Sequence, residues 1–315
     1  MKIRGEMTLI SLIQLGTVDY ATGLRLQQQL VALRKEETIG DVLLLLEHSP
    51  VITLGRNANA ANIIASAELL TQRGVELFEC DRGGDVTFHG PGQIVGYPIF
   101  DLRGFATPDG KRKTLGAVEF VRRLEEVLIR ACADFAIPTK RVPGLTGVWT
   151  TAESDNAHVG TAASAVQRSE ASPAERDREG HDFSRAEKRP DKEAALAAEV
   201  GSPEAKLAAI GVHISRSVTS HGFALNVNTD LSYFNLIVPC GITAKPVTSM
   251  QQELGKPLEL NAVAESISRN FGTVFSSQIL WVETLDALFG RTIGVPIKPP
   301  AELRELHKEK DTTWA

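Results

Sequence analysis

The pattern of apolar and polar positions predicts a fold in which strands and helices are mixed. Short apolar runs, typical of strands, occupy residues 8–15, 42–47, 51–54, 74–80, 94–100, 147–150, 206–215 and 223–227. Longer segments repeat apolar residues at helical spacing over residues 19–37, 114–135 and from 260 to just beyond 271. Because these elements do not alternate strictly, the pattern predicts an α/β (α+β) fold, a mixed β-sheet with flanking helices.

A polar stretch interrupts this pattern. The 55 residues from 151 to 205 hold 19 charged residues and only five large apolar ones. Such a segment buries too little apolar area to offset the entropy cost of ordering it, which favours disorder. We therefore predict one domain over residues 1–290, interrupted by a disordered insertion at 151–205 and followed by an extension at 291–315. The strand-like segments at 147–150 and 206–215 would then pair as a hairpin with the insertion at its tip.

Composition narrows the classes of function. The chain has 315 residues, with 34 Lys and Arg against 39 Asp and Glu, and the net charge of −5 argues against a nucleic-acid binder. No apolar run is long enough to span a membrane, and the N-terminal residues lack the features of a signal peptide. Three cysteines are too few for a disulfide scaffold, so a reducing cytoplasm is the expected compartment.

Three segments carry more glycine, histidine and charged residues than a structural strand or turn needs. Segment 81–93 contains four glycines together with an arginine and a histidine, so its backbone can approach a ligand closely. Segment 206–214 begins with Lys206 and continues as an apolar strand. Segment 220–228 is followed at short distance by Cys240, which stands between a proline and a glycine. These residue types make the three segments candidates for one site.

Each segment also has an ordinary structural interpretation. A glycine-rich segment is usually a turn, a lysine at a strand end is normally solvated, and such a cysteine can be a small buried residue. A metal site formed by His89, His213, His221 and Cys240 is weakly supported, because no pair has a recognised ligand spacing. Neither of the usual glycine-rich phosphate-binding motifs occurs in the sequence.

Taken together, the segments resemble a known family. The motifs that carry the resemblance are His48-x-Pro50-Val51-x-Thr53-x-Gly55-Arg56, Arg82-Gly83-Gly84-x-x-Thr87-Phe88-His89-Gly90-Pro91-Gly92-Gln93-x-x-x-Tyr97, Lys206-Leu-Ala-Ala-Ile-Gly211, His221-Gly-Phe-Ala-Leu-Asn226 and Pro239-Cys240-Gly241. In this order they resemble the lipoyl(octanoyl) transferase family, over about residues 10–150 and 206–290. The main departure is the insertion just before Lys206, whose following Ala-Ala-Ile-Gly context identifies it as the family's lysine.

The resemblance implies a transfer of octanoyl and a fold similar to the catalytic domains of biotin and lipoate ligases. It implies Cys240 as the nucleophile and Lys206 as its partner, with no cofactor and no metal. The implied partners are octanoyl-acyl carrier protein as donor, and lipoyl domains of 2-oxoacid dehydrogenases and the glycine cleavage H protein as acceptors, without nucleic acid or membrane. The implied acyl-binding residues are Arg82, Gly83, Gly84, Asp85, Val86, Thr87, Phe88, His89, Ala209, Ile210, Gly211, Gly222, Phe223 and Ala224, with His221 and Tyr97 in support.

The residue types suit this chemistry. A thiol nucleophile conserves the energy of a donor thioester in a covalent acyl-enzyme and divides the transfer into two easier steps. A neighbouring ammonium favours the thiolate, and lysine, unlike arginine, can give up a proton and take it back. Of the other two cysteines, Cys132 is expected in the core, whereas Cys80 lies close to the glycine-rich segment and is the rival nucleophile.

Further features of the site are expected with less support from the sequence. The candidates for an apolar slot that holds the octanoyl chain are Phe88, Ile210, Phe223 and Leu225. Backbone amides near Gly84 or Gly211 are expected to stabilise an oxyanion. Basic clusters at 111–113, 122–123 and 140–141 are expected to steer acidic partner proteins.

Two alternative functions stay open at this point. An ATP-dependent ligase of the lipoate or biotin type would form an acyl-adenylate and would need no nucleophilic cysteine. A non-catalytic acyl or carrier-protein binding module would keep the glycine-rich segment and lack the cysteine and lysine pair. The presence of Cys240 and Lys206 favours the transferase.

Overall fold

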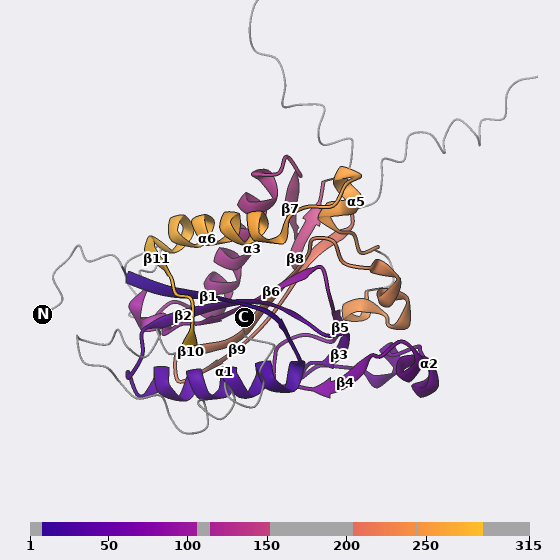
Figure 1. The fold of residues 1–315 in the computed structure, drawn as a ribbon, viewed down its shortest axis with the longest axis horizontal. Coiled ribbons are helices and arrows are strands. Elements are labelled where there is room, and N and C mark those ends of the chain that lie inside the picture. Colours follow the sequence, from indigo (N-terminus) through magenta and orange to yellow (C-terminus); the bar gives the residue numbers. More distant parts are fainter. Residues whose placement is uncertain (1–7, 106–113, 152–203, 243–244, 286–315) are drawn as a thin grey trace, which may run out of the picture. The chain divides into compact units, whose positions relative to one another are not determined.

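The computed structural model describes residues 8–105, 114–151, 204–242 and 245–285 (Figure 1). Apart from residue 151, all of these lie in one compact unit. Most of the predicted insertion at 151–205 and the whole predicted extension at 291–315 lie outside the described residues. No helix among the described residues is long and apolar enough to cross a membrane.

The described residues form a large mixed sheet. Its eight strands follow the order β11-β1-β2-β6-β10-β9-β8-β7. Their bounds are β1 Thr8–Val18, β2 Asp41–His48, β6 Gln93–Ile99, β7 Thr139–Val142, β8 Leu145–Thr150, β9 Lys206–Ser215, β10 Val218–Asn226 and β11 Ser277–Trp281. Strand β1 pairs in parallel with β2 and β11, whereas the other neighbours pair antiparallel. The prediction of a mixed sheet is therefore confirmed.

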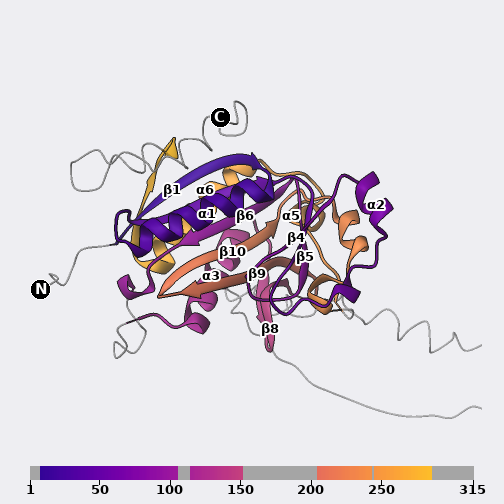
Figure 2. The same cartoon turned by 90° about the horizontal axis from the view of Figure 1, so that it is seen from below.

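Helices cover both faces of this sheet. Helix α1 (Tyr20–Lys35) lies across β6 and β10 on one face, as Figure 2 shows. Helices α3 (Ala117–Ala133) and α6 (Leu260–Phe275) pack on the opposite face (Figure 1). Because both faces are covered, β2 reads as an unbroken apolar run rather than an alternating one. Its Leu43 and Leu45 join the cluster under α3 and α6, while Leu44 joins the cluster under α1.

A smaller sheet stands beside the large one and carries much of the glycine-rich segment. Its order is β4-β3-β5, with bounds β3 Val51–Leu54, β4 Glu76–Glu79 and β5 Val86–His89. The short helices α2 (Ala67–Gln72) and α5 (Met250–Leu254) and single 3₁₀ turns complete the described part of the chain. Strands β5, β7 and β11 and helix α2 were not predicted, because four to six residues carry too little periodicity to identify an element.

The strands on either side of the insertion pair directly. Strand β8 runs antiparallel to β9, with Val148 opposite Ala208 and Trp149 opposite Lys206. The predicted hairpin is confirmed in this respect. Since β9 also pairs with β10, Lys206 and residues 209–211 lie on an interior strand of the sheet.

Candidate active site

The side chains of Lys206 and Cys240 meet, although they are 34 residues apart in the chain. The Nζ atom of Lys206 donates a hydrogen bond to the Sγ atom of Cys240 at 3.2 Å. Lys206 is 8 % exposed, and Cys240 is half-buried. The ammonium of Lys206 also lies over the ring of Trp149, 5.1 Å from its centroid, which is a cation–π contact. The pair that was predicted from motifs far apart in sequence is therefore in direct contact.

The backbone of Lys206 is fixed from both sides. On one side it pairs with Trp149 of β8, and on the other it forms a bridge with Val247. Its N–H donates to the carbonyl of Pro246 at 2.8 Å, and its carbonyl accepts from the N–H of Thr248 at 2.9 Å. These bonds hold the Cα atom of a long, flexible side chain in one place, which reduces the entropy lost when the ammonium meets the thiol.

Cys240 stands in a tight turn with a left-handed backbone. The turn is the 3₁₀ element Pro239–Gly241, in which Cys240 has φ 55° and Gly241 has φ 66°. A non-glycine residue in this region costs of order 1 kcal/mol or more, and such strain persists where the surrounding structure imposes it. Here the N–H of Val238 donates to the carbonyl of Asn62 at 2.7 Å and ties the turn to another loop. The left-handed conformation directs the thiol toward Lys206.

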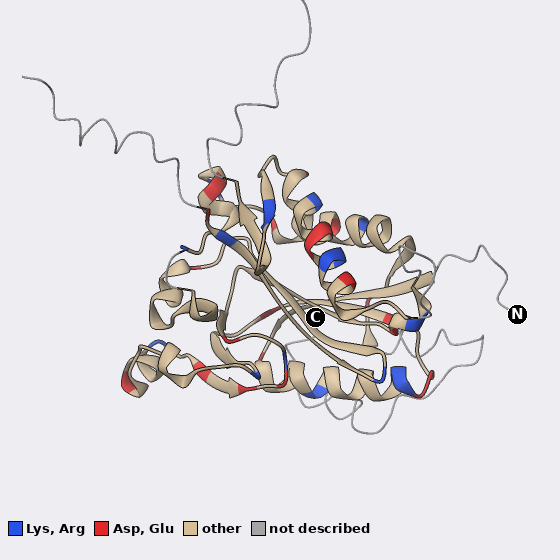
Figure 3. Ribbon diagram, turned by 180° about the vertical axis from the view of Figure 1, so that it is seen from behind, with Lys and Arg blue, Asp and Glu red and all other residues tan. Residues whose placement is uncertain are grey.

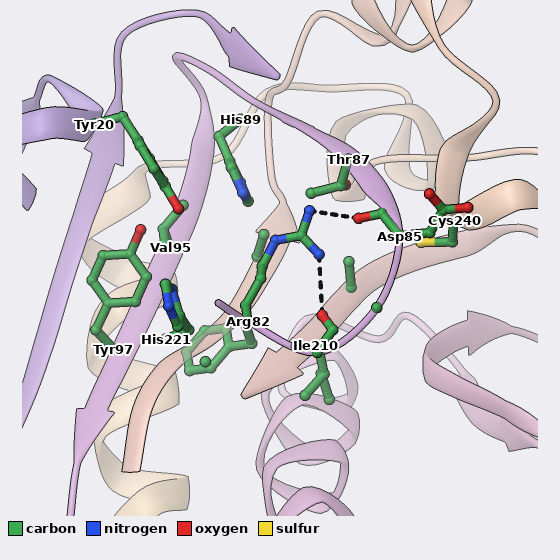
Figure 4. Close-up of a pocket in the computed structure, with 17 residues that line it drawn as sticks. Tyr20, Arg82, Asp85, Thr87, His89, Val95, Tyr97, Ile210, His221 and Cys240 are labelled. Atoms are coloured by element: carbon green, nitrogen blue, oxygen red, sulfur yellow. Dashed lines mark hydrogen bonds between the residues drawn. The ribbon is translucent and has the colours of Figure 1, made fainter. Parts of the chain in front are cut away.

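A pocket extends from Cys240 between the glycine-rich segment and strands β9 and β10 (Figure 4). From the glycine-rich segment, the predicted residues that line it are Arg82, Gly83, Gly84, Asp85, Thr87 and His89. From the two strands, the predicted lining residues are Ala209, Ile210, Gly211, Gly222, Phe223 and Ala224, together with His221, and Tyr97 lines it from β6. Cys240 lies at one end, and Tyr20, Tyr97 and His221 lie at the other (Figure 4).

Three predicted residues do not line this pocket. Val86 and Phe88 are fully buried and belong to a separate apolar cluster, in which Phe88 stacks on Tyr233 with ring centroids 4.6 Å apart. Leu225 is fully buried in the core under α3 and α6. The reason is the twofold alternation of strands: Thr87 and His89 of β5 face the pocket, so Val86 and Phe88 face away from it. Of the four residues expected to form the acyl slot, Phe88 and Leu225 therefore do not line this pocket.

Two lining residues were missed by the sequence analysis. Val95 on β6 is two residues from Tyr97, so the same alternation identifies it once Tyr97 is placed in the pocket. Tyr20 is the first residue of α1, after the capping residue Asp19, and no sequence motif marks it. Its position depends on how α1 lies on the sheet, which is a tertiary property.

Arg82 organises the glycine-rich segment. Its guanidinium donates to the carbonyl of Thr53 at 2.7 Å, to the hydroxyl of Thr53 at 2.9 Å and to the carbonyl of Asp85 at 2.7 Å. A further bond goes to the carbonyl of Gly83 at 3.1 Å (Figure 4). Arg82 is 8 % exposed, so most of its donors are used within the protein. We assign it the role of a positioning residue that shapes the pocket wall.

The glycines of the pocket wall permit a close approach between backbones. The N–H of Gly83 donates to the carbonyl of Val212 on β9 at 3.1 Å, which holds the glycine-rich segment against the sheet. A Cβ atom added to Gly211 would lie 2.6 Å from the carbonyl oxygen of Gly83. Since the obstacle is backbone, the segment itself would have to move.

We expect the Gly211→Ala substitution to open the pocket wall. The added Cβ should displace Gly83, lower kcat/KM for octanoyl transfer at least about tenfold and cost about 1–3 kcal/mol of stability through overpacking. Steady-state kinetics and urea unfolding measure both effects. The matched control is Gly40→Ala, because no heavy atom lies within 4 Å of a Cβ at that position. Equal kinetics for the two variants would contradict this account of the wall.

Two buried histidines near the pocket are neutral. Burial is the main cause that lowers the pKa of His48 to about 4 and that of His89 to about 3. The Nδ1 atom of His48 lies 2.7 Å from the carbonyl of Val18, so this nitrogen carries the proton, and Nε2 accepts from the hydroxyl of Tyr97 at 2.6 Å. A neutral histidine with both nitrogens bonded positions its neighbours and does not transfer protons.

His89 belongs to a directed chain of hydrogen bonds. The side-chain nitrogen of Gln93 donates to Oδ1 of Asn226 at 2.9 Å, which fixes the orientation of the Gln93 amide. The Oε1 atom of Gln93 therefore faces His89 and accepts from its Nδ1 atom at 2.7 Å. The side chain of Asn226 in turn donates to the carbonyl of Thr248 at 2.9 Å. This chain links the glycine-rich segment to the residues that bracket Lys206. His89 is therefore a positioning residue as well.

The two neutral histidines predict a pH dependence of stability. Their pKa values are lower in the folded protein than in the unfolded chain. Their contribution to the free energy of unfolding is therefore complete above about pH 6.5 and is lost as the pH falls toward 4 and then 3. At pH 5 each histidine should lower the free energy of unfolding by roughly 2 kcal/mol relative to its value at pH 7. Urea unfolding at the two pH values measures the loss. His48→Gln should remove about half of the difference between the two pH values. A free energy of unfolding that does not change with pH in this range would exclude the effect of the two histidines.

The other cysteines are placed away from the reaction. Cys132 is fully buried in α3, and burial raises the pKa of its thiol to about 12. The Sγ atom of Cys80 donates to the carbonyl of Leu54 at 3.4 Å, and Cys80 does not line the pocket. Of the three thiols, that of Cys240 is the one in the pocket. Among the described residues, no group of three or more His, Cys, Asp or Glu side chains is placed to hold a metal ion.

The basic clusters expected to steer partners are largely engaged in ion pairs. Arg122 and Arg141 both contact the buried carboxylate of Glu125, at 2.6 and 3.1 Å. Lys140 contacts Glu204 at 2.9 Å. Figure 3 shows acidic and basic residues close together along α3. Cluster 111–113 lies outside the described residues.

Comparison with known proteins decides the family. Residues 19–272 match the lipoyl protein ligase A/B catalytic domain family. An octanoyltransferase of Koribacter versatilis is 53 % identical over 96 % of this chain and 98 % of its own length. This chain belongs to the octanoyltransferases of the lipoyl protein ligase A/B family. An octanoyltransferase of Acidobacterium capsulatum is 49 % identical over 88 % of this chain and 94 % of its own length. As an octanoyltransferase, the protein is an acyltransferase enzyme.

Solved structures confirm the fold of this octanoyltransferase. A bipartite lipoate protein ligase of Thermoplasma acidophilum superimposes with a TM-score of 0.56 at 13 % identity, over 89 % of each chain. A lipoate-protein ligase A bound with ATP superimposes with a TM-score of 0.54 at 11 % identity, over 97 % of this chain and 96 % of its own. At these identities the likeness concerns the fold alone. The predicted similarity to the catalytic domain of lipoate ligases is confirmed.

Proposed function

We propose that this octanoyltransferase works through a thioester on Cys240, with Lys206 as the group that moves protons. The observation that supports it is the 3.2 Å contact between Nζ and Sγ at the end of the pocket that Cys240 lines. The donor is octanoyl-acyl carrier protein. The acceptors are lysines of lipoyl domains in 2-oxoacid dehydrogenases and of the glycine cleavage H protein.

In the first half of the reaction, the donor thioester is exchanged for an enzyme thioester. The thiolate of Cys240 attacks the octanoyl carbonyl carbon, and the bond from that carbon to the carrier's sulfur breaks. The departing sulfur takes a proton from the ammonium of Lys206, which lies within hydrogen-bond distance of Sγ. Lys206 is then a neutral amine with no anion beside it, and it lies buried in the site.

In the second half, the acyl group passes to the acceptor lysine. The neutral amine of Lys206 takes a proton from the acceptor ammonium, and the acceptor amine attacks the carbonyl carbon of the acyl-enzyme. The bond between this carbon and Sγ of Cys240 breaks, an amide forms, and one further proton leaves to solvent. The thiolate and the ammonium of the resting pair are then restored.

The octanoyl chain lies in the pocket from Cys240 toward Tyr20, Tyr97 and His221. The apolar walls near it are Ile210 and Phe223, the two predicted slot residues that line the pocket. Gly84 and Gly211, proposed as sources of backbone amides for the oxyanion, line the same pocket. The domain proposal also stays as predicted, with one catalytic domain over 1–290 that the segment 151–205 interrupts.

The test is octanoyl transfer with purified components. Enzyme, octanoyl-acyl carrier protein and a lipoyl domain are mixed without ATP, and the masses of enzyme and lipoyl domain are followed. The expected result is an octanoyl adduct on the enzyme that appears first and a lipoyl domain that gains the same mass afterwards. Modification of the lipoyl domain by free octanoate only when ATP is added would instead identify a ligase.

A further inference from the structure

A second cavity meets the pocket at His221, at the end that is remote from Cys240. It has a volume of about 490 Å³ and is bounded by α1, the adjoining ends of β9 and β10, and residues 79–81. Leu24 and Val31 of α1 and Val218 of β10 supply its apolar surface, and the remaining lining residues are mostly polar or charged, Lys35 and Glu79 among them. His221 is the residue that lines both spaces, so its side chain forms the partition between them.

The partition is held firmly. The Nε2 atom of His221 lies 2.7 Å from Oδ1 of Asp81, and the backbone N–H of His221 donates to Oε1 of Gln27 at 2.8 Å. The ring of Tyr97 meets that of His221 at 83°, with centroids 6.4 Å apart. His221 is 3 % exposed. A group that displaced this buried imidazole would break its hydrogen bond to Asp81, whose carboxylate is half exposed.

We infer that His221, fixed by Asp81, is the end wall that limits the length of the acyl chain. The inference rests on the proposed function, in which the acyl carbonyl sits at Cys240 and the chain points toward His221. A chain longer than octanoyl meets the imidazole. Without the imidazole, the added methylene groups enter the second cavity and contact Leu24, Val31 and Val218. His221 is thus a specificity-determining residue for the donor.

The backbone at this position indicates which variants keep the fold. His221 has φ 55°, a left-handed conformation that glycine adopts without strain and asparagine tolerates better than most residues. His221→Gly removes the whole partition at no conformational cost in φ. His221→Asn removes part of it and keeps a polar group near Asp81. The matched control is Ser215→Ala, because Ser215 lines the second cavity and does not line the pocket.

The test compares acylation of Cys240 by octanoyl-, decanoyl- and dodecanoyl-acyl carrier protein, followed by intact mass. Burial of one methylene changes affinity about fourfold, so His221→Gly should raise the dodecanoyl-to-octanoyl ratio of rates at least about tenfold. His221→Asn should show a smaller rise, and Ser215→Ala should keep the wild-type ratio. Circular dichroism and urea unfolding show that each variant is folded.

The outcomes separate the inference from the function on which it rests. If wild-type Cys240 accepts octanoyl and the folded His221 variants keep the wild-type ratio, the end-wall inference is overturned and the proposed function stands. If His221→Gly does not fold, the ratio measured for His221→Asn decides in the same way. If wild-type Cys240 accepts no octanoyl at all, the proposed function fails, and the inference fails with it.

Discussion

Cys240→Ala is expected to lose the octanoyl adduct and to lower the rate of transfer at least about a thousandfold. The reason is geometric as well as chemical, because Cys240 supplies the thiol that lines the pocket and lies 3.2 Å from Lys206. Without it, the acceptor amine would have to attack the donor thioester directly, and both carrier protein and acceptor would have to bind at once. Intact mass of the enzyme after exposure to octanoyl-acyl carrier protein measures the adduct.

The matched control for this variant is Cys80→Ala. Cys80 follows β4, bonds to the carbonyl of Leu54 and lies outside the pocket, so its removal should leave the adduct in place. An octanoyl group found on Cys80 in the Cys240→Ala protein would overturn the assignment of the nucleophile. Retention of transfer without any adduct would point to direct attack instead.

Lys206→Arg is expected to show the second large effect, a loss of about 10²–10⁴ in kcat. Arginine keeps the positive charge but cannot give up its proton in a protein, so it cannot activate the acceptor amine. Formation of the acyl-enzyme should therefore slow, because the departing sulfur loses its proton donor, and transfer to the lipoyl domain should slow further, because the acceptor amine is not activated. Single-turnover mass spectrometry measures formation and consumption of the adduct separately.

A second variant separates charge from proton transfer. Lys206→Met keeps the length of the side chain and removes the charge, so formation of the adduct should slow more than in Lys206→Arg, which keeps the charge. The control is Lys245→Arg, because the ammonium of Lys245 also lies over Trp149, at 5.7 Å, but is paired with Glu204. Wild-type turnover by Lys206→Arg would exclude the role of Lys206 in proton transfer.

Much of the fold follows from local patterns in the sequence. Asp19 was expected to begin a helix, and its side chain accepts from the N–H of Thr22 at the start of α1. The apolar run 42–47 is a strand covered on both faces, as such runs usually are. The hairpin across residues 151–205 was also expected, because a polar insertion between two strand-like segments leaves the pairing of those segments intact.

The sequence failed where placement depends on the direction of a side chain. Val86 and Phe88 belong to the same four-residue strand as Thr87 and His89, and only the existence of β5 divides these residues into two faces. Because the sequence pattern does not predict β5, it offers no way to divide residues 82–89 into those that face the ligand and those that face away. Tyr20 was missed because the start of a helix carries no information about the sheet beneath it.

By itself, then, the sequence determined the family and predicted the reacting pair, because residue types in a fixed order are enough for both. Only the tertiary structure decided that Lys206 and Cys240 meet, since 34 residues of chain, the register of β9 and a left-handed turn set that distance. It also decided that His221 separates two cavities. The physical reason is that a wall or a contact depends on atoms from several elements at once, whereas sequence patterns report on one element at a time.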